Sequence, residues 1–200
     1  MEKISPGSAG IILSLKIRLS KFAFRIQFAR LLLSWNTKLP PAVVNHETFE
    51  HLLPLAYEWA KQQEEFILAH GHPLGPTHAW DAHLAGVRDC ARIRVLVVDR
   101  IPLPENPKLA EQARRAGIIT EGTRCMGFGH ALIVRGDAWN DRELVVHNLV
   151  HIAQCERSGG LEEWVRRYLG DRTSCPEFTH GLLESEARRI AREICAANAA

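Results

Sequence analysis

One segment, residues 140–160, constrains the fold more than any other, because it predicts a helix that is apolar on almost every face. Asn140 followed three residues later by Glu143 is typical of a helix start, and Gly159 with Gly160 is typical of a helix end. The apolar residues between them are Leu144, Val145, Val146, Leu149, Val150, Ile152 and Ala153. Other elements must cover such a helix on all sides. The segment therefore predicts a buried helix inside a folded domain.

The composition sets the size and class of that domain. Two hundred residues suffice for one domain, and 46% hydrophobic with 24% charged residues is ordinary globular composition, which excludes wholesale disorder. No run of about eighteen uncharged apolar residues occurs, so no transmembrane helix is expected. Five cysteines without a CxxC pair argue against a disulfide scaffold and suit a reducing compartment. We therefore expect a cytoplasmic protein.

Positive charge is concentrated in the N-terminal part of the sequence. Residues 1–45 carry seven Lys and Arg against Glu2 alone, and the remaining 18 basic and 22 acidic groups lie in residues 46–200. We expect a basic N-terminal extension followed by one mildly acidic domain, which is not expected to bind nucleic acid. We favour a loosely ordered extension; contact of its basic residues with an anionic membrane surface is the alternative.

The rest of residues 46–200 predicts an α+β fold that is mainly helical. Apolar residues at helical spacing predict helices over residues 54–69 and 182–197, and a third helix is expected over 108–116. Two β-branched, apolar runs predict strands over residues 93–99 and 129–135. The second strand comes directly before the buried helix in the sequence.

Two histidines interrupt the apolar helix. His147 and His151 are four residues apart, so both lie on one face of the helix. A buried imidazole needs partners for its nitrogens, and two at this spacing can direct their Nε2 atoms to one Zn²⁺ at about 2.0–2.1 Å. The alternative is a pair of core histidines, hydrogen-bonded to carboxylates or backbone carbonyls without a metal.

Residues 147–160 and 183–187 resemble two segments of the HExxH zinc metallopeptidases, the zincin superfamily. The first reads His-Asn-Leu-Val-His-Ile-Ala-Gln-Cys-Glu-Arg-Ser-Gly-Gly and is similar to small uncharacterised bacterial members that read roughly VHELVHVAQ and ERxGG. The second reads Leu-Glu-Ser-Glu-Ala, like their C-terminal LExEA helix. The resemblance implies a zincin-like fold with a small sheet, whose edge strand lies beside the active-site helix, and a bound zinc ion.

The sequence departs from the family motif at the position of its general base. The motif has Glu directly after the first His, and this sequence has Asn148. In the family that Glu takes a proton from the zinc-bound water and delivers it to the leaving amine. An amide cannot accept a proton near neutral pH, so it cannot supply the factor of about 10²–10⁴ that general-base catalysis contributes. Glu143, one helical turn before His147, is the candidate substitute base, although its carboxylate would lie about 6 Å away along the helix axis.

The third zinc ligand is not fixed by periodicity. In the glutamate-ligand branch of the superfamily this ligand is a Glu on a later helix, often followed by Ala. The helix expected over residues 182–197 offers Glu184 and Glu186, which lie equally far from its apolar stripe on opposite sides. The resemblance to a Glu-Ala pair favours Glu186, with Glu184 as the alternative and His180 as a further candidate.

These observations predict a zincin-like, zinc-binding domain with weak or absent peptidase activity. Its partner would be a peptide or a protein, bound in the cleft that holds the substrate in active peptidases. His130, on the strand expected to be the edge strand, is a candidate substrate-binding residue. Two alternatives stay open: an active zinc-dependent hydrolase that uses another base, and a structural or binding domain without metal. A second group of histidines, at positions 70, 72, 78 and 83, is interpreted as a solvated loop.

Overall fold

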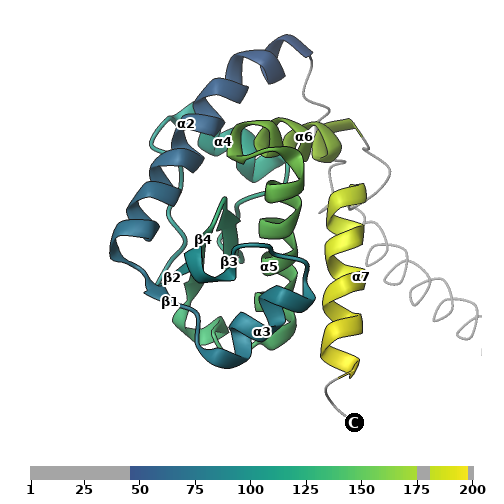
Figure 1. Cartoon of the computed structure of the whole chain (residues 1–200). Helices are drawn as coiled ribbons and strands as arrows, with labels where there is room; N and C mark the ends of the chain where they lie inside the picture. The colour runs from purple at the N-terminus through teal and green to yellow at the C-terminus, as the bar shows by residue number, and fades with distance from the viewer. Residues whose placement is uncertain (1–45, 175–180, 198–200) are drawn as a thin grey trace, which may run out of the picture. The chain divides into compact units, whose positions relative to one another are not determined.

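The computed structural model of the chain describes residues 46–174 and 181–197. The chain separates into two units, Met1–Pro40 and Pro41–Ala200, and the described residues all lie in the second. The expected basic extension over residues 1–45 and the candidate ligand His180 lie outside the described residues. The described part has the predicted α+β class (Figure 1).

The helices are longer than the strands and make up most of the fold. They are α2 (His46–His70), α3 (Pro76–Leu84), α4 (Pro107–Arg115), α5 (Arg142–Ser158), α6 (Leu161–Ser174) and α7 (Leu182–Ala197). The strands are β1 (His72–Pro73), β2 (Arg94–Val98), β3 (Cys125–Phe128) and β4 (Ala131–Arg135), and two 3₁₀ turns span Cys90–Arg92 and Gly136–Ala138. Within the described ranges, no helix combines the length and the apolar content that crossing a membrane requires.

The four strands form one sheet in the order β1-β2-β4-β3. β2 and β4 are parallel, whereas β1–β2 and β3–β4 are antiparallel pairs. The strand expected over residues 129–135 is therefore central, which corrects the prediction that it is the edge strand. The edge strand next to β4 is β3, and a two-residue turn at Gly129 and His130 pairs Phe128 with Ala131. Gly129 has a φ of +57°, which glycine adopts without strain.

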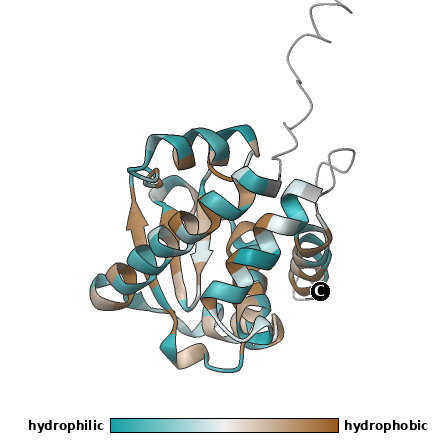
Figure 2. Cartoon of the chain, turned by 90° about the horizontal axis from the view of Figure 1, so that it is seen from above, coloured by the Kyte–Doolittle hydropathy of each residue, from teal (hydrophilic) through white to brown (hydrophobic). Residues whose placement is uncertain are grey.

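β4 is buried on both faces, because it contributes alternate side chains to two cores. Ala131 and Ile133 pack with residues of α2, α4 and α6, and Leu132 and Val134 pack with residues of α3, α5 and α7. Figure 2 shows apolar segments in the sheet, whereas the helices carry both apolar and polar residues along their length. The continuous apolar run of residues 131–134 is typical of a strand that is covered on both faces.

α5 is the buried helix that residues 140–160 predict. Val145, Val146, Leu149, Val150, Ile152 and Ala153 are at most 1% exposed. The N-cap is Asp141, one residue after the expected Asn140, and its carboxylate accepts a hydrogen bond from the backbone N–H of Leu144 at 3.2 Å. The helix ends at Gly159, which has a φ of +96° and so takes the left-handed conformation that glycine favours.

α7 lies alongside α5 (Figure 1), and this is the most extensive contact between any two elements of the described structure. Ala187 and Ala191 of α7 are fully buried in the core that α5 shares with the sheet. Small side chains at these two positions let the helix backbones approach closely. The contact fixes which face of α7 is turned toward α5.

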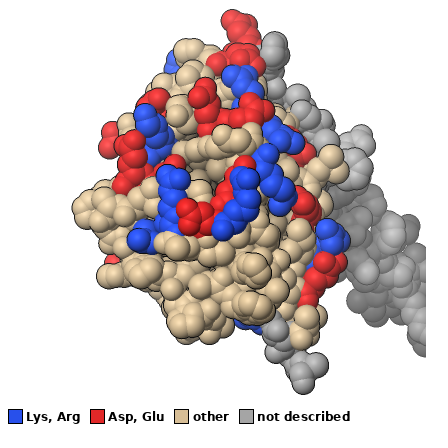
Figure 3. Space-filling model, viewed as in Figure 1, with Lys and Arg blue, Asp and Glu red and all other residues tan. Residues whose placement is uncertain are grey.

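Charged side chains of opposite sign are interspersed on the surface in Figure 3, over the upper part of the face shown. The lower part, where α3 lies in Figure 1, is largely uncharged. Several pairs are local, such as Arg189 with Glu193 and Arg115 with Glu111, each at 2.8 Å within one helix. Exposed pairs of this kind contribute little to the free energy of unfolding.

A buried ion pair joins α3 to the start of α5. Asp81 is fully buried, and Nε of Arg142 donates a 3.0 Å hydrogen bond to its Oδ2 while Nη2 donates to Oδ1. The hydrogen bonds from Arg142 outweigh burial and hold the pKa of Asp81 below its usual value. Because the folded-state pKa is depressed, the stability that this carboxylate contributes is present above about pH 4 and is lost as the pH falls below it.

We expect Asp81→Asn to lower the free energy of unfolding by about 2–4 kcal/mol at pH 7, since the change leaves a partly buried guanidinium without its charged partner. The difference from wild type should shrink between about pH 5 and pH 3, as measured by urea unfolding. Asp137→Asn is the matched control, because Asp137 pairs with Arg135 but is exposed. Equal effects of the two substitutions would contradict the assignment.

Candidate metal centre

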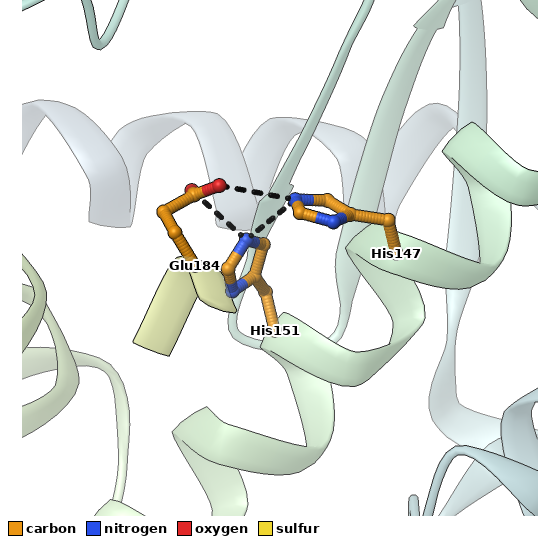
Figure 4. Close-up of side chains that lie close together, drawn as sticks. All are labelled: His147, His151 and Glu184. Carbon is orange, nitrogen blue, oxygen red and sulfur yellow. Dashed lines mark hydrogen bonds and ion pairs between the residues drawn. The ribbon is translucent and has the colours of Figure 1, made fainter. Parts of the chain in front are cut away.

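Three side chains from two helices converge: His147 and His151 of α5 and Glu184 of α7 (Figure 4). The Nε2 atoms of the two imidazoles lie 3.0 Å apart. Oε2 of Glu184 lies 3.5 Å from Nε2 of His147, and Oε1 lies 3.2 Å from Nε2 of His151. No other group of three His, Cys, Asp or Glu side chains converges in this way among the residues that the structure describes.

The spacing of these atoms is close to that of a tetrahedral zinc ligand set. Ligand atoms about 2.0–2.1 Å from a zinc ion at tetrahedral angles lie about 3.3–3.4 Å from one another. The separations of 3.0, 3.2 and 3.5 Å bracket that value. Two imidazoles and one carboxylate are also the protein ligands of one class of catalytic zinc site. The three residues therefore form a group that could hold a metal ion.

The carboxylate in the cluster belongs to Glu184, the alternative candidate, and not to Glu186. Glu186 lies on the other side of α7, where its carboxylate accepts hydrogen bonds from Gln154 at 2.8 Å and from Arg157 at 3.0 Å. Glu184 is 8% exposed and continues the buried stripe of Ala187 and Ala191. The two predicted histidines thus converge with Glu184, the alternative candidate, and not with Glu186, the favoured one.

Glu184 is anionic although it is buried. Burial alone would raise the pKa of this carboxyl, but hydrogen bonds with His147, His151 and Tyr168 hold it well below its usual range. Oη of Tyr168 donates to Oε1 of Glu184 at 2.6 Å. Burial beside this carboxylate raises the pKa of Tyr168, so the phenol stays a donor. A carboxylate that faces two imidazole nitrogens supplies the negative charge that a bound cation needs.

The cluster lines a cleft of about 400 Å³ to which β3, α5, α6 and α7 contribute. Asn148 lines it too and is 5% exposed, and its Nδ2 donates a 2.9 Å hydrogen bond to the backbone oxygen of Leu144. Glu184 is the only carboxylate among the described residues that line the cleft. The residue directly after His147 is therefore an amide that is bonded back to its own helix.

The edge strand β3 lies very close to α5 at this point. A Cβ atom on Gly127 would lie 3.3 Å from the backbone oxygen of Asn148 and 3.6 Å from Cγ1 of Ile152. Only glycine meets these atoms without a small displacement of the neighbours. The edge strand beside the helix is thus present, but residues 125–128 supply it.

The structure places the other candidates outside the cleft. Nε2 of His130 is 2.9 Å from Oε1 of Glu156, and the backbone N–H of His130 donates to Glu64, so His130 is held in the β3–β4 turn. The substrate-binding role expected for it has no support in this placement. Glu143, the substitute base, forms an exposed pair with Arg192 at 3.5 Å.

The second group of histidines does not converge in the described residues. Nδ1 of His70 is 2.8 Å from the backbone oxygen of Phe66, and the ring of His83 stacks on Trp80. His78 lies 3.5 Å from Asp81. Three of the four histidines, His70, His72 and His83, are exposed, but the group lies in α2, β1 and α3, which corrects the prediction of a loop.

Sequence reasoning missed two neighbours of the cluster, Tyr168 and Gln154. Tyr168 belongs to α6, which could have been found from the helical spacing of its apolar residues, Leu161, Trp164, Val165, Tyr168 and Leu169. Gln154 lies three residues after His151 and is polar inside an apolar helix, so it needs a buried partner. Both signals are in the sequence.

The chain matches no protein-family model, no curated protein and no solved structure. The likeness to HExxH peptidases therefore rests on the motifs of this sequence. What the site can do is inferred from its donor atoms and their surroundings.

Proposed function

We propose that residues 46–200 form a zincin-like, zinc-binding domain with a degenerate HNxxH site and weak or absent peptidase activity. The convergence of His147, His151 and Glu184 in one cleft carries this proposal. Zinc is the favoured metal because nitrogen ligands from imidazole and one carboxylate suit it better than Mg²⁺ or Ca²⁺, which prefer oxygen ligands. A zinc ion held there would act as a Lewis acid toward a bound carbonyl group.

Among the described residues that line the cleft, we find no carboxylate that is free to act as a general base. The amide of Asn148 cannot take a proton, and Glu184 is committed to the two imidazoles and to Tyr168. Glu143 faces Arg192 and does not line the cleft. These placements support weak or absent amide hydrolysis over the alternative of an active hydrolase with another base.

The cleft itself is suited to an extended peptide. β3 is at the end of the sheet, and three of its residues, Cys125, Met126 and Gly127, line the cleft. An edge strand can pair with an extended segment of a partner through backbone hydrogen bonds. We therefore propose that the domain binds a peptide or a protein segment beside the metal.

Metal analysis of the purified full-length chain tests the central claim. After dialysis against zinc and then against metal-free buffer, we expect about one zinc ion per chain by mass spectrometry of the metal, because three converging ligands fit one ion. The variant His147→Ala should retain far less. A ratio well below one for the wild type would leave the alternative of a domain without metal.

A further inference from the structure

Gln154 contacts the side of the His151 ring that is turned away from His147 and Glu184. Nδ1 of His151 lies 2.7 Å from Oε1 of Gln154, while Nε2 of the same ring faces His147 and Glu184. Gln154 is 2% exposed, and His151 is 6% exposed. The hydrogen bond between them is therefore shielded from water, and each atom in it must find its partner within the protein.

The orientation of the Gln154 amide follows from its other contacts. The atom assigned as Nε2 lies 2.9 Å from the backbone oxygen of Leu183 and 2.8 Å from Oε2 of Glu186. Both neighbours can only accept, since Glu186 is a carboxylate paired with Arg157 at 3.0 and 3.1 Å. The group between two acceptors must be the NH₂ end of the amide. Its oxygen therefore faces His151.

A carbonyl oxygen accepts hydrogen bonds and cannot donate them, so Nδ1 of His151 must carry the proton that joins the two residues. We propose that Arg157, Glu186, Gln154 and His151 form a positioning relay. The relay keeps a proton on Nδ1 of His151 and leaves Nε2 as the nitrogen that binds the cation. The claim about Nε2 rests on the proposed function, whereas the claim about the Nδ1 proton stands on the hydrogen bonds alone.

The relay acts on two ligands through one side chain. Gln154 orients the imidazole of His151 on α5 and, through its bond to Leu183, the backbone directly before Glu184 on α7. Its outer end is an ion pair whose side chains are 48% and 36% exposed. Groups that orient a metal ligand in this way change metal affinity by about 10–100-fold when they are removed. Gln154 is thus a positioning residue and not a ligand.

Nitrogen-15 NMR of the wild type tests the position of the proton without any substitution. Full-length protein labelled at the histidine ring nitrogens would be recorded without metal and after addition of one equivalent of Zn²⁺. We expect Nδ1 of His151 to have the chemical shift of a protonated nitrogen in both spectra, and only Nε2 to change with zinc. A protonated Nδ1 in a protein that binds no zinc would support the relay and contradict the proposed function. An unprotonated Nδ1 in the zinc-loaded protein would overturn the relay.

Zinc affinity of Gln154→Leu tests what the relay does. We expect the affinity, measured by competition with a chelator, to fall about 10–100-fold, and the Nδ1 signal of His151 to lose its protonated position. Ser158→Ala is the matched control, because Oγ of Ser158 donates to the backbone oxygen of Gln154 at 2.9 Å and not to the side-chain amide. Equal losses in both variants, or unchanged affinity in Gln154→Leu, would refute the relay. If Gln154→Leu does not fold, the wild-type spectrum decides.

Discussion

Asn148→Glu is expected to raise the rate of peptide hydrolysis by about 10²–10⁴-fold over the wild type, because it restores a proton acceptor beside the proposed zinc ligands. The side chain at this position lines the cleft, next to the helix face that carries His147 and His151. The Asn148 amide donates a hydrogen bond to the backbone oxygen of Leu144, and the substitution breaks this local contact. The measurement is kcat/KM on a library of fluorogenic peptides with zinc-loaded protein.

Asn148→Gln is the matched control for this prediction. Glutamine has the length of glutamate but cannot take up a proton, so no gain in rate is expected. If the wild type already cleaved peptides as fast as Asn148→Glu, the interpretation of a degenerate site would be wrong. If the zinc-loaded glutamate variant gained nothing, the likeness to HExxH peptidases would not extend to the geometry of the reaction.

Glu184→Gln and Glu186→Gln are expected to differ sharply in zinc affinity. The two residues are on one helix, two positions apart, but only Glu184 faces the imidazoles. Glu184→Gln removes an anionic ligand, and we expect its affinity to fall by more than about 100-fold, the upper range for supporting groups that merely orient a ligand. Glu186→Gln keeps an oxygen that can accept from Gln154, and we expect a change of less than about tenfold.

Isothermal titration with Zn²⁺ distinguishes the two variants, and circular dichroism checks that both keep the helical content of the wild type. A larger loss in Glu186→Gln would restore the assignment that the sequence alone favours. Equal, small losses in both would mean that the two histidines bind the metal without a carboxylate from α7.

The sequence predicts the two histidines well because their signal is local. α5 is apolar on every side, so any polar pair in it stands out, and a spacing of four residues places both imidazoles on one face. The choice between Glu184 and Glu186 depends instead on how α7 is rotated against α5. Ala187, Ala191 and Ile194 are buried on one face of α7, and Glu184 continues this buried stripe. Leu183 is apolar but less buried, so it does not belong to the stripe.

The edge strand shows the opposite case. Residues 125–128 read Cys-Met-Gly-Phe, which neither alternates in polarity nor is rich in β-branched residues. Their strand conformation comes from pairing with β4 across the turn at Gly129, a contact that local propensity does not encode. An apolar run such as residues 131–135 predicts a strand, but its place in the sheet depends on neighbours that the run itself does not identify.

Because α7 packs against α5, a metal ion bound between them would also affect the stability of the fold. A cation shared by side chains of both helices would act as a reversible cross-link, and the chain would be more resistant to unfolding when the metal is abundant. At a free metal concentration one hundred times the dissociation constant, this linkage adds about 2.7 kcal/mol. The stability of the contact between α7 and α5 would then depend on the concentration of the free metal ion.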